Sequence, residues 1–234
     1  MNKNFIWLIL LVIGIVAGIY IWRTYYRPAS ARTVQVLAWI KDPASHPDLA
    51  LTAGSKCGSA PFAFPTTGMI GYIWDDSFHI GHRHQGIDIF AGTDIGVTKV
   101  FAAYPGYLTR LSDWKSSVIV RAPDDPLHPG RQIWVYYTHM ADAKGNSFIS
   151  PDFPPGTSEK YIDAGTFLGY QGDYSGDPNN PVGAHLHVSI VKDNNGHFMN
   201  ELDINNTYDP SPYFGLALNA NTNPDEIPVC KASK

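Results

Sequence analysis

Short hydrophobic runs alternate with polar turn signals through most of residues 57–207. The runs are rich in β-branched and aromatic residues, and Gly, Pro, Asn and Asp separate them, a pattern typical of strands. None shows sustained helical periodicity, which predicts an all-β domain built mainly from antiparallel strands. We expect strands within residues 68–74, 84–90, 98–104, 106–112, 116–122, 131–140, 166–172 and 184–191. Residues 143–160 are rich in Pro, Gly and Ser, and we interpret them as a long surface loop.

The segments that flank this domain have a different composition. Residues 28–56 repeat Pro, Ser and Ala, which predicts a linker with one short strand at 34–40. Residues 208–234 are polar and contain prolines, and we expect a C-terminal tail that is held only through Cys230.

An uncharged, strongly apolar run covers residues 5–22. As a helix that rises about 1.5 Å per residue, it approaches the roughly 30 Å thickness of a bilayer core. We therefore expect residues 1–27 to form a transmembrane anchor. A cleaved signal peptide is the alternative, because residues 29–31 read ASA, but the run is long for a signal and two arginines precede that site.

Charges and cysteines disagree on the side of the membrane that carries the domain. One lysine precedes the apolar run and three arginines follow it, which by the positive-inside rule alone favours the cytoplasm. Cys57 and Cys230 flank the folded region and suit one disulfide in an oxidising compartment, although two unrelated buried thiols are the alternative. On the cysteines, we expect a single-pass protein of the cell membrane with an extracytoplasmic domain, or a cleaved and secreted form.

Composition narrows the classes of function. The chain has 234 residues, of which 44% are hydrophobic and 16% charged, as in globular proteins, and its formal net charge is −4. Without a basic patch, a nucleic-acid partner has no electrostatic support. We expect a monomer.

Candidate metal ligands occur in the stretch HRHQGIDIF, residues 82–90. In a strand, His84, Gly86 and Asp88 share one face, and the glycine leaves open space between an imidazole and a carboxylate. These two side chains form two-thirds of a zinc triad. His82 shares the face and is the nearest rival ligand, but it lies further from Asp88, and we expect it at the rim of a cleft.

Two further histidine-bearing strands supply the rest of a hydrolytic site. In AHLHVSI, His185 and His187 alternate onto one face, and one of them completes a site with three protein ligands and an open position. The other imidazole then lies beside the activated water as a base. His139 in YYTHM is placed to stabilise an oxyanion. This inventory indicates metal-assisted amide hydrolysis.

The three stretches HQGIDI, YYTHM and GAHLHVSI, in this order, resemble the signatures of the lysostaphin-type zinc endopeptidases, also called the LytM or glycyl-glycine endopeptidase family. The spaced Gly165, Gly169 and Gly172 are similar to the glycines of that family. The resemblance extends over about residues 66–190.

The resemblance implies a β-sheet-rich fold in which His84, Asp88 and His187 bind Zn²⁺ and His185 and His139 are the catalytic histidines. It also implies that the substrate is the peptide part of bacterial cell-wall peptidoglycan, in stems or cross-bridges. The alternative is a catalytically silent or latent module that binds cell wall or regulates another hydrolase. Silent relatives usually lose ligands or catalytic histidines, whereas all five positions are filled here.

Overall fold

The computed structural model describes residues 3–25, 31–76 and 82–230, with the side chains of the first helix described at 5, 7 and 9–20. Its helices are α1 (Lys3–Tyr25), α2 (Ala31–Lys41) and α3 (Ser211–Phe214), and three short 3₁₀ helices cover Pro43–Ser45, Pro47–Leu49 and Ile204–Asn206. Its strands are β1 (Met69–Tyr72), β2 (Ile87–Phe90), β3 (Lys99–Phe101), β4 (Gly106–Thr109), β5 (Val118–Ala122), β6 (Ile133–Thr138), β7 (Lys160–Ile162), β8 (Phe167–Tyr170), β9 (Leu186–Asn194), β10 (His197–Phe198) and β11 (Thr207–Tyr208). The predicted strand regions each contain a strand, so the sheet-rich class is confirmed.

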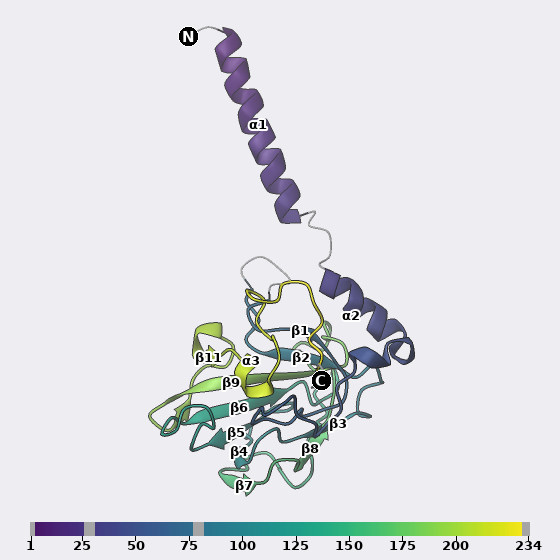
Figure 1. Ribbon diagram of the computed structural model, residues 1–234, viewed down its shortest axis with the longest axis vertical. Coiled ribbons are helices and arrows are strands. Elements are labelled where there is room, and N and C mark those ends of the chain that lie inside the picture. Colours follow the sequence, from purple (N-terminus) through teal and green to yellow (C-terminus); the bar gives the residue numbers. More distant parts are fainter. Residues whose placement is uncertain (1–2, 26–30, 77–81, 231–234) are drawn as a thin grey trace.

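One antiparallel sheet forms the body of the molecule (Figure 1). Within the described ranges it has nine strands, with the order β1-β2-β9-β6-β5-β4-β7 and with β10 and β11 added on β9, while β3 and β8 pair separately. The central pairing joins β6 to β9 over six residues, from Ile133 opposite Lys192 to Thr138 opposite His187. Sequence-distant strands therefore lie side by side, and histidine-bearing segments far apart in the chain reach one surface.

The two faces of this sheet differ because side chains alternate along each strand. Leu186, Val188 and Ile190 of β9 point into the main hydrophobic core, together with alternate residues of β5 and β6. His187 and Ser189 point to the opposite face, which we call the site face. Burial of one face against the core fixes the strand register and thereby the residues that reach the site face.

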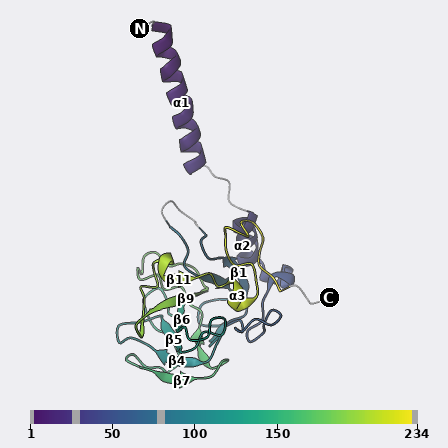
Figure 2. The ribbon, with the colours of Figure 1, turned by 60° about the vertical axis from the view of Figure 1, so that its left-hand side comes forward.

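The prediction of a strand at residues 34–40 was wrong, because this segment belongs to α2 (Figure 2). Arg32, Val36 and Trp39 are buried, at the spacing of one helix face, and Val36 and Trp39 pack against Met69 and Phe90 of β1 and β2. The β-branched residues of the run satisfied strand propensity, but the spacing of its buried positions is helical. A segment of the predicted linker is therefore packed on the sheet.

Polar contacts also fasten α2. The Arg32 guanidinium lies 2.9 Å from the Asp76 carboxylate and donates a hydrogen bond to the carbonyl of Asn223. The indole N–H of Trp39 donates to the carbonyl of Phe90 at 2.9 Å. Both donors are buried, so each contact offsets the cost of removing a polar group from water.

The C-terminal segment was expected to be held only through Cys230, and this was wrong. Cys57 and Cys230 form the predicted disulfide, with Cα atoms 5.4 Å apart. Phe214 and Leu218 are also buried in the main core, and Ile227 packs beside α2. Apolar residues spaced along a proline-containing segment can fill the core without regular periodicity, which explains why the sequence pattern did not indicate their burial.

Asp125 is a buried carboxylate that contacts the C-terminal segment through Tyr213. The hydroxyl of Tyr213 donates to it at 2.8 Å, the backbone N–H of Leu127 donates at 2.9 Å, and Arg131 forms an ion pair. Burial acts to raise the pKa of Asp125, but the hydrogen bonds from Leu127, Tyr213 and Arg131 outweigh it and hold the pKa below its usual value.

The expected loop at residues 143–160 is irregular until β7 begins at Lys160. It is nevertheless packed, because Ile149 and Phe153 are buried in the main core. The backbone N–H of Ser150 donates to the carbonyl of Leu168, which ties the loop to β8.

The apolar N-terminal run forms α1, whose described side chains are all exposed and which projects away from the sheet in both views (Figures 1 and 2). Among the residues that the structure describes, no helix combines the length and the apolar character needed to cross a membrane. The expected transmembrane anchor is therefore not supported.

Candidate metal centre

Asp88 and His187 meet because β2 and β9 are neighbours in the sheet. They are directly opposite each other in the antiparallel register, and both side chains lie on the site face. A Cβ atom at Gly86 would lie 2.1 Å from the carbonyl oxygen of Val188 and 3.0 Å from Nε2 of His187. Glycine is therefore required where the chain enters β2, because any side chain would push β2 and β9 apart.

His84 does not belong to a strand as expected, because β2 begins only at Ile87. It lies in the preceding loop, where its backbone N–H donates to the carbonyl of Asp76 and its carbonyl accepts from the N–H of Asp75. Its ring Nδ1 lies 3.0 Å from the carbonyl oxygen of Ile73. A carbonyl only accepts, so Nδ1 carries the proton and Nε2 faces the cluster.

The three inward atoms form a small triangle. Nε2 of His84 lies 3.0 Å from Nδ1 of His187 and 3.1 Å from Oδ1 of Asp88, and Nδ1 of His187 lies 2.9 Å from the same oxygen. Around tetrahedral zinc with ligand bonds of about 2.0–2.1 Å, ligand atoms are about 3.3 Å apart. Two imidazoles and a carboxylate are also a donor set found at catalytic zinc. In both geometry and chemistry, the three residues fit a zinc ion.

Electrostatics supports the same assignment. Asp88 is 5% exposed, and within the described part of the chain its ion-pair partners are His84, His185 and His187. Burial acts to raise the pKa of Asp88, but the neighbouring imidazoles lower it well below its usual value, so the carboxylate is ionised. Burial acts to lower the pKa of His84, yet the carboxylate raises it overall. A buried carboxylate surrounded by imidazoles favours a cation at their centre.

His185 and His139 lie beside this triangle, as the sequence predicted. Nε2 of His185 lies 3.5 Å from Oδ1 of Asp88, and the rings of His185 and His139 have centroids 4.6 Å apart. Burial lowers the pKa of His185 to about 3 and, for the same reason, lowers the pKa of His139. Both imidazoles are therefore neutral at pH 7.

Backbone carbonyls fix the tautomers of these two rings. Nδ1 of His185 lies 3.0 Å from the carbonyl of Gly183, and Nδ1 of His139 lies 2.7 Å from the carbonyl of Tyr174. Each Nδ1 therefore carries the proton, and each Nε2 presents a lone pair. This modifies the expected role of His139, because a neutral ring with a bare Nε2 accepts a proton before it can donate to an oxyanion.

The backbone and one aromatic ring constrain the pair further. His139 follows β6 with a φ of 71°, a left-handed conformation that is costly for a residue other than glycine. Gly172 pairs with His185 in an isolated antiparallel β-bridge. A Cβ atom at position 172 would lie 2.5 Å from the carbonyl oxygen of His139, so only glycine fits there. Phe90 stacks on the ring of His185, with centroids 4.9 Å apart.

All five predicted side chains thus converge on the site face, whereas His82 is outside the triangle with its ring 6.3 Å from that of His84. The sequence did not indicate the orienting groups, namely the carbonyls of Ile73, Gly183 and Tyr174 and the ring of Phe90. Backbone carbonyls are common to all residues, so no side-chain motif marks them. The alternation between Asp88 and Phe90 was the one signal that could have placed that ring on the site face.

Comparisons with known proteins give weak likenesses. No family model matches the chain, and no curated protein matches it. The catalytic domain of the antimicrobial peptidase lysostaphin from Staphylococcus simulans is 17% identical, with 67% of this chain and 92% of that domain covered and a TM-score of 0.40. The catalytic domain of the prophage-encoded protein EnpA from Enterococcus faecalis is 19% identical, with 63% and 95% covered and a TM-score of 0.38. Csd3 from Helicobacter pylori is 17% identical, with 62% and 32% covered and a TM-score of 0.34. Likenesses of this strength do not establish the activity of the chain.

Proposed function

We propose that this chain is a zinc-dependent endopeptidase that hydrolyses peptide bonds in bacterial peptidoglycan. The observation that carries the proposal is the triangle of His84, Asp88 and His187 with two further neutral imidazoles, His185 and His139, on its open side. A structural zinc site is usually closed by four protein ligands, whereas three ligands beside free bases suit catalysis.

In this proposal His84, Asp88 and His187 hold zinc, which supplies a Lewis acid that polarises the scissile carbonyl and makes water acidic enough to react at neutral pH. His185 takes up a proton from the attacking water at Nε2. The resulting imidazolium faces Asp88 at 3.5 Å, which stabilises its charge, and it can later release the proton to the leaving amine.

His139 has the same tautomer and is placed to share this proton. Once protonated at Nε2, it donates to the oxyanion of the tetrahedral intermediate, while the carbonyl of Tyr174 holds Nδ1. Its left-handed backbone keeps the ring turned toward His185 at the end of β6. The two histidines thus function as a proton-exchanging pair.

The substrate class follows from the ordered motifs of the sequence, which resemble those of peptidoglycan endopeptidases. We place the domain on the extracytoplasmic side, where peptidoglycan is found. The disulfide between Cys57 and Cys230 supports an oxidising compartment.

The proposal is tested by zinc content and by release of new amino termini from purified peptidoglycan, with and without a chelator. We expect one zinc per chain and chelator-sensitive hydrolysis. His84→Ala or Asp88→Ala should abolish both, whereas His185→Ala should retain zinc and lose roughly a hundredfold or more in turnover. His128→Ala removes an exposed histidine and serves as the control.

Stoichiometric zinc in both ligand variants would contradict the ligand assignment. Near wild-type turnover in His185→Ala would contradict the assigned base. Zinc binding without hydrolysis by the wild-type chain would favour a latent or silent module.

A further inference from the structure

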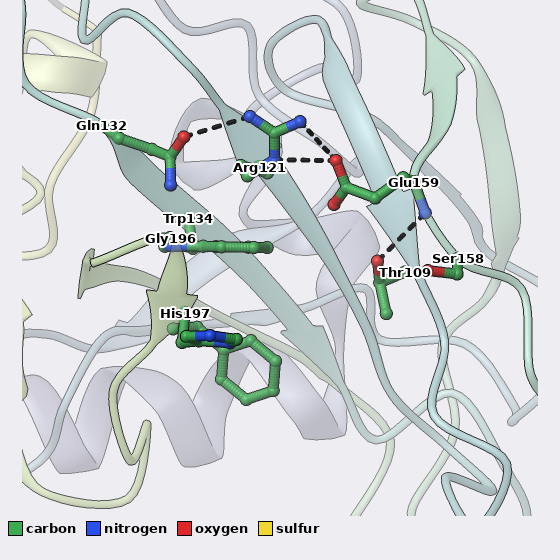
Figure 3. Close-up of a pocket in the computed structure, with 9 residues that line it drawn as sticks. Thr109, Arg121, Gln132, Trp134, Ser158, Glu159, Gly196 and His197 are labelled. Carbon is green, nitrogen blue, oxygen red and sulfur yellow. Dashed lines mark hydrogen bonds and ion pairs between the residues drawn. The ribbon is translucent and has the colours of Figure 1, made fainter. Parts of the chain in front are cut away.

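A cavity opens on the site face, away from the candidate metal centre. It has a volume of about 430 Å³ and lies over β4, β5 and β6, with β10 on one side and the turn before β7 on the other (Figure 3). Its lining includes Arg121, Gln132, Trp134, Glu159 and His197. This volume is within the range of small-ligand sites.

In this cavity, which we call the distal pocket, Arg121, Gln132, Trp134 and Glu159 belong to one hydrogen-bond network. Arg121 donates to Glu159 from Nε at 2.8 Å and to Gln132 from Nη1 at 3.0 Å. The amide of Gln132 and the indole N–H of Trp134 both donate to Oδ1 of Asp193, at 2.6 and 2.8 Å. In Figure 3 the guanidinium lies between the Gln132 and Glu159 side chains, above the edge of the Trp134 ring. The network holds the side chains in fixed positions before any ligand binds.

The balance of charge and polarity indicates the kind of ligand. The charge of Arg121 is neutralised by Glu159, and the Asp193 carboxylate beside them accepts hydrogen bonds from Gln132 and Trp134, so the pocket has no excess positive charge to attract an anion. Glu159 offers acceptor positions, and Ser158, Arg121 and His197 offer donors, while the half-buried ring of Phe198, which packs edge-on against the buried Trp134, provides aromatic surface. A sugar ring matches this lining, because it combines hydroxyls that both donate and accept with an apolar C–H face that packs on aromatic rings.

The position of the pocket suggests which sugar. Thr138 of β6 is opposite His187, whereas Trp134 is opposite Val191, four residues further along both strands on the same face. Four residues of a strand span about 13 Å. An extended peptide of about four residues covers the same distance. In peptidoglycan, each stem peptide is joined at its amino terminus to a sugar of the glycan.

We propose that the distal pocket binds an uncharged amino-sugar ring of the glycan while the attached stem peptide extends along the site face to the metal centre. The inference rests on the proposed function for its substrate class. The surface between the two sites supports such a path, because Trp114 is half-buried and its ring contacts both Tyr136 and Phe198, with centroids 5.6 and 5.7 Å apart.

The first experiment is an NMR titration of the full chain with the peptide-free disaccharide of N-acetylglucosamine and N-acetylmuramic acid, with its lactyl carboxyl group capped as a simple amide so that the sugar is uncharged, as it is when a stem peptide is attached. We expect saturable movement of the indole N–H resonance of Trp134, assigned with Trp134→Phe, and no movement of the Trp39 resonance. Glu159→Gln and His197→Ala should each weaken binding about fivefold or more, which is the loss expected for one good hydrogen bond. The matched controls Glu226→Gln and His128→Ala change exposed residues outside the pocket and should bind as the wild type does.

The second experiment compares hydrolysis of one stem peptide with and without its sugar. We expect a KM at least fivefold lower for the sugar-bearing peptide, and His197→Ala should remove that difference while leaving hydrolysis of the sugar-free peptide unchanged. Equal KM values in the wild type, or absence of disaccharide binding, would overturn the pocket assignment and leave the proposed peptidase intact. Saturable disaccharide binding without hydrolysis of either peptide would uphold a sugar site and remove the peptidase instead.

Discussion

Trp39 is the residue through which we expect α2 to influence His185, one of the two histidines to which we assign the proposed catalysis. It is buried, its indole N–H donates to the carbonyl of Phe90, and the Phe90 ring stacks on His185. Trp39→Phe keeps an aromatic ring in this position but removes the hydrogen bond. The lost bond costs about 1 kcal/mol, and the smaller ring leaves a cavity that costs roughly 1 kcal/mol more. We expect the free energy of unfolding to fall by about 2 kcal/mol, which corresponds to roughly 4–8 °C in Tm for a domain of this size.

The assay combines thermal unfolding with zinc content and steady-state kinetics. We expect Trp39→Phe to retain zinc and KM but to lower kcat, because Phe90 no longer holds the ring of His185 as firmly. Leu37→Ala, on the exposed side of the same helix with Leu37 61% exposed, is the matched control and should change stability by less than about 0.5 kcal/mol. An unchanged Tm would refute the packing of α2 on the sheet. A lower Tm with unchanged kcat would refute the orienting role of Phe90.

Three further predictions concern the rest of the framework. Reduction of the disulfide between Cys57 and Cys230, which are 173 residues apart, should lower the unfolding free energy by up to about 5 kcal/mol in guanidinium titrations, and an unchanged midpoint would contradict this. Asp125 has a pKa held below its usual value, so its contribution to stability is full above about pH 4 and is lost as the pH falls through the lower folded pKa. Urea midpoints of the wild type and Asp125→Asn should therefore converge on acidification, and a constant difference down to pH 2 would exclude this linkage. Gly86→Ala places a Cβ atom 2.1 Å from the carbonyl oxygen of Val188 and should cost about 1–3 kcal/mol and weaken zinc binding, so zinc titration at wild-type affinity would show that the strands can shift.

The sequence predicted which side chains meet at the candidate metal centre, because its spacing rules act through the sheet. Asp88 and His187 are on strands that pair directly, and alternation alone places both on the site face. His84 was found for a partly incorrect reason. It is brought to the triangle by hydrogen bonds from the loop before β2, not by strand alternation.

Elements that depend on tertiary packing were harder to predict. Val36 and Trp39 are in a run that is rich in β-branched and aromatic residues, and contact with Phe90 determines that they belong to a helix. The distal pocket has no motif at all, because Arg121, Gln132 and Glu159 come from three segments that meet only after the strands pair. A short motif indicates the chemistry of residues within one segment. A pocket formed by several segments can be predicted only when the order of the strands in the sheet is known.

The metal centre and the distal pocket share one structural determinant, the register between β6 and β9. Thr138 opposite His187 sets the position of one site, and Trp134 opposite Val191 sets the other. A slip of one residue would turn both sets of side chains into the core, and burial of the opposite face opposes it. Backbone changes in these strands should therefore disable metal binding and sugar binding together. His197 belongs to β10 and takes no part in the pairing of β6 with β9. A change of its side chain should therefore weaken sugar binding and leave metal binding unchanged. The pocket can thus be tested without disturbing the metal centre.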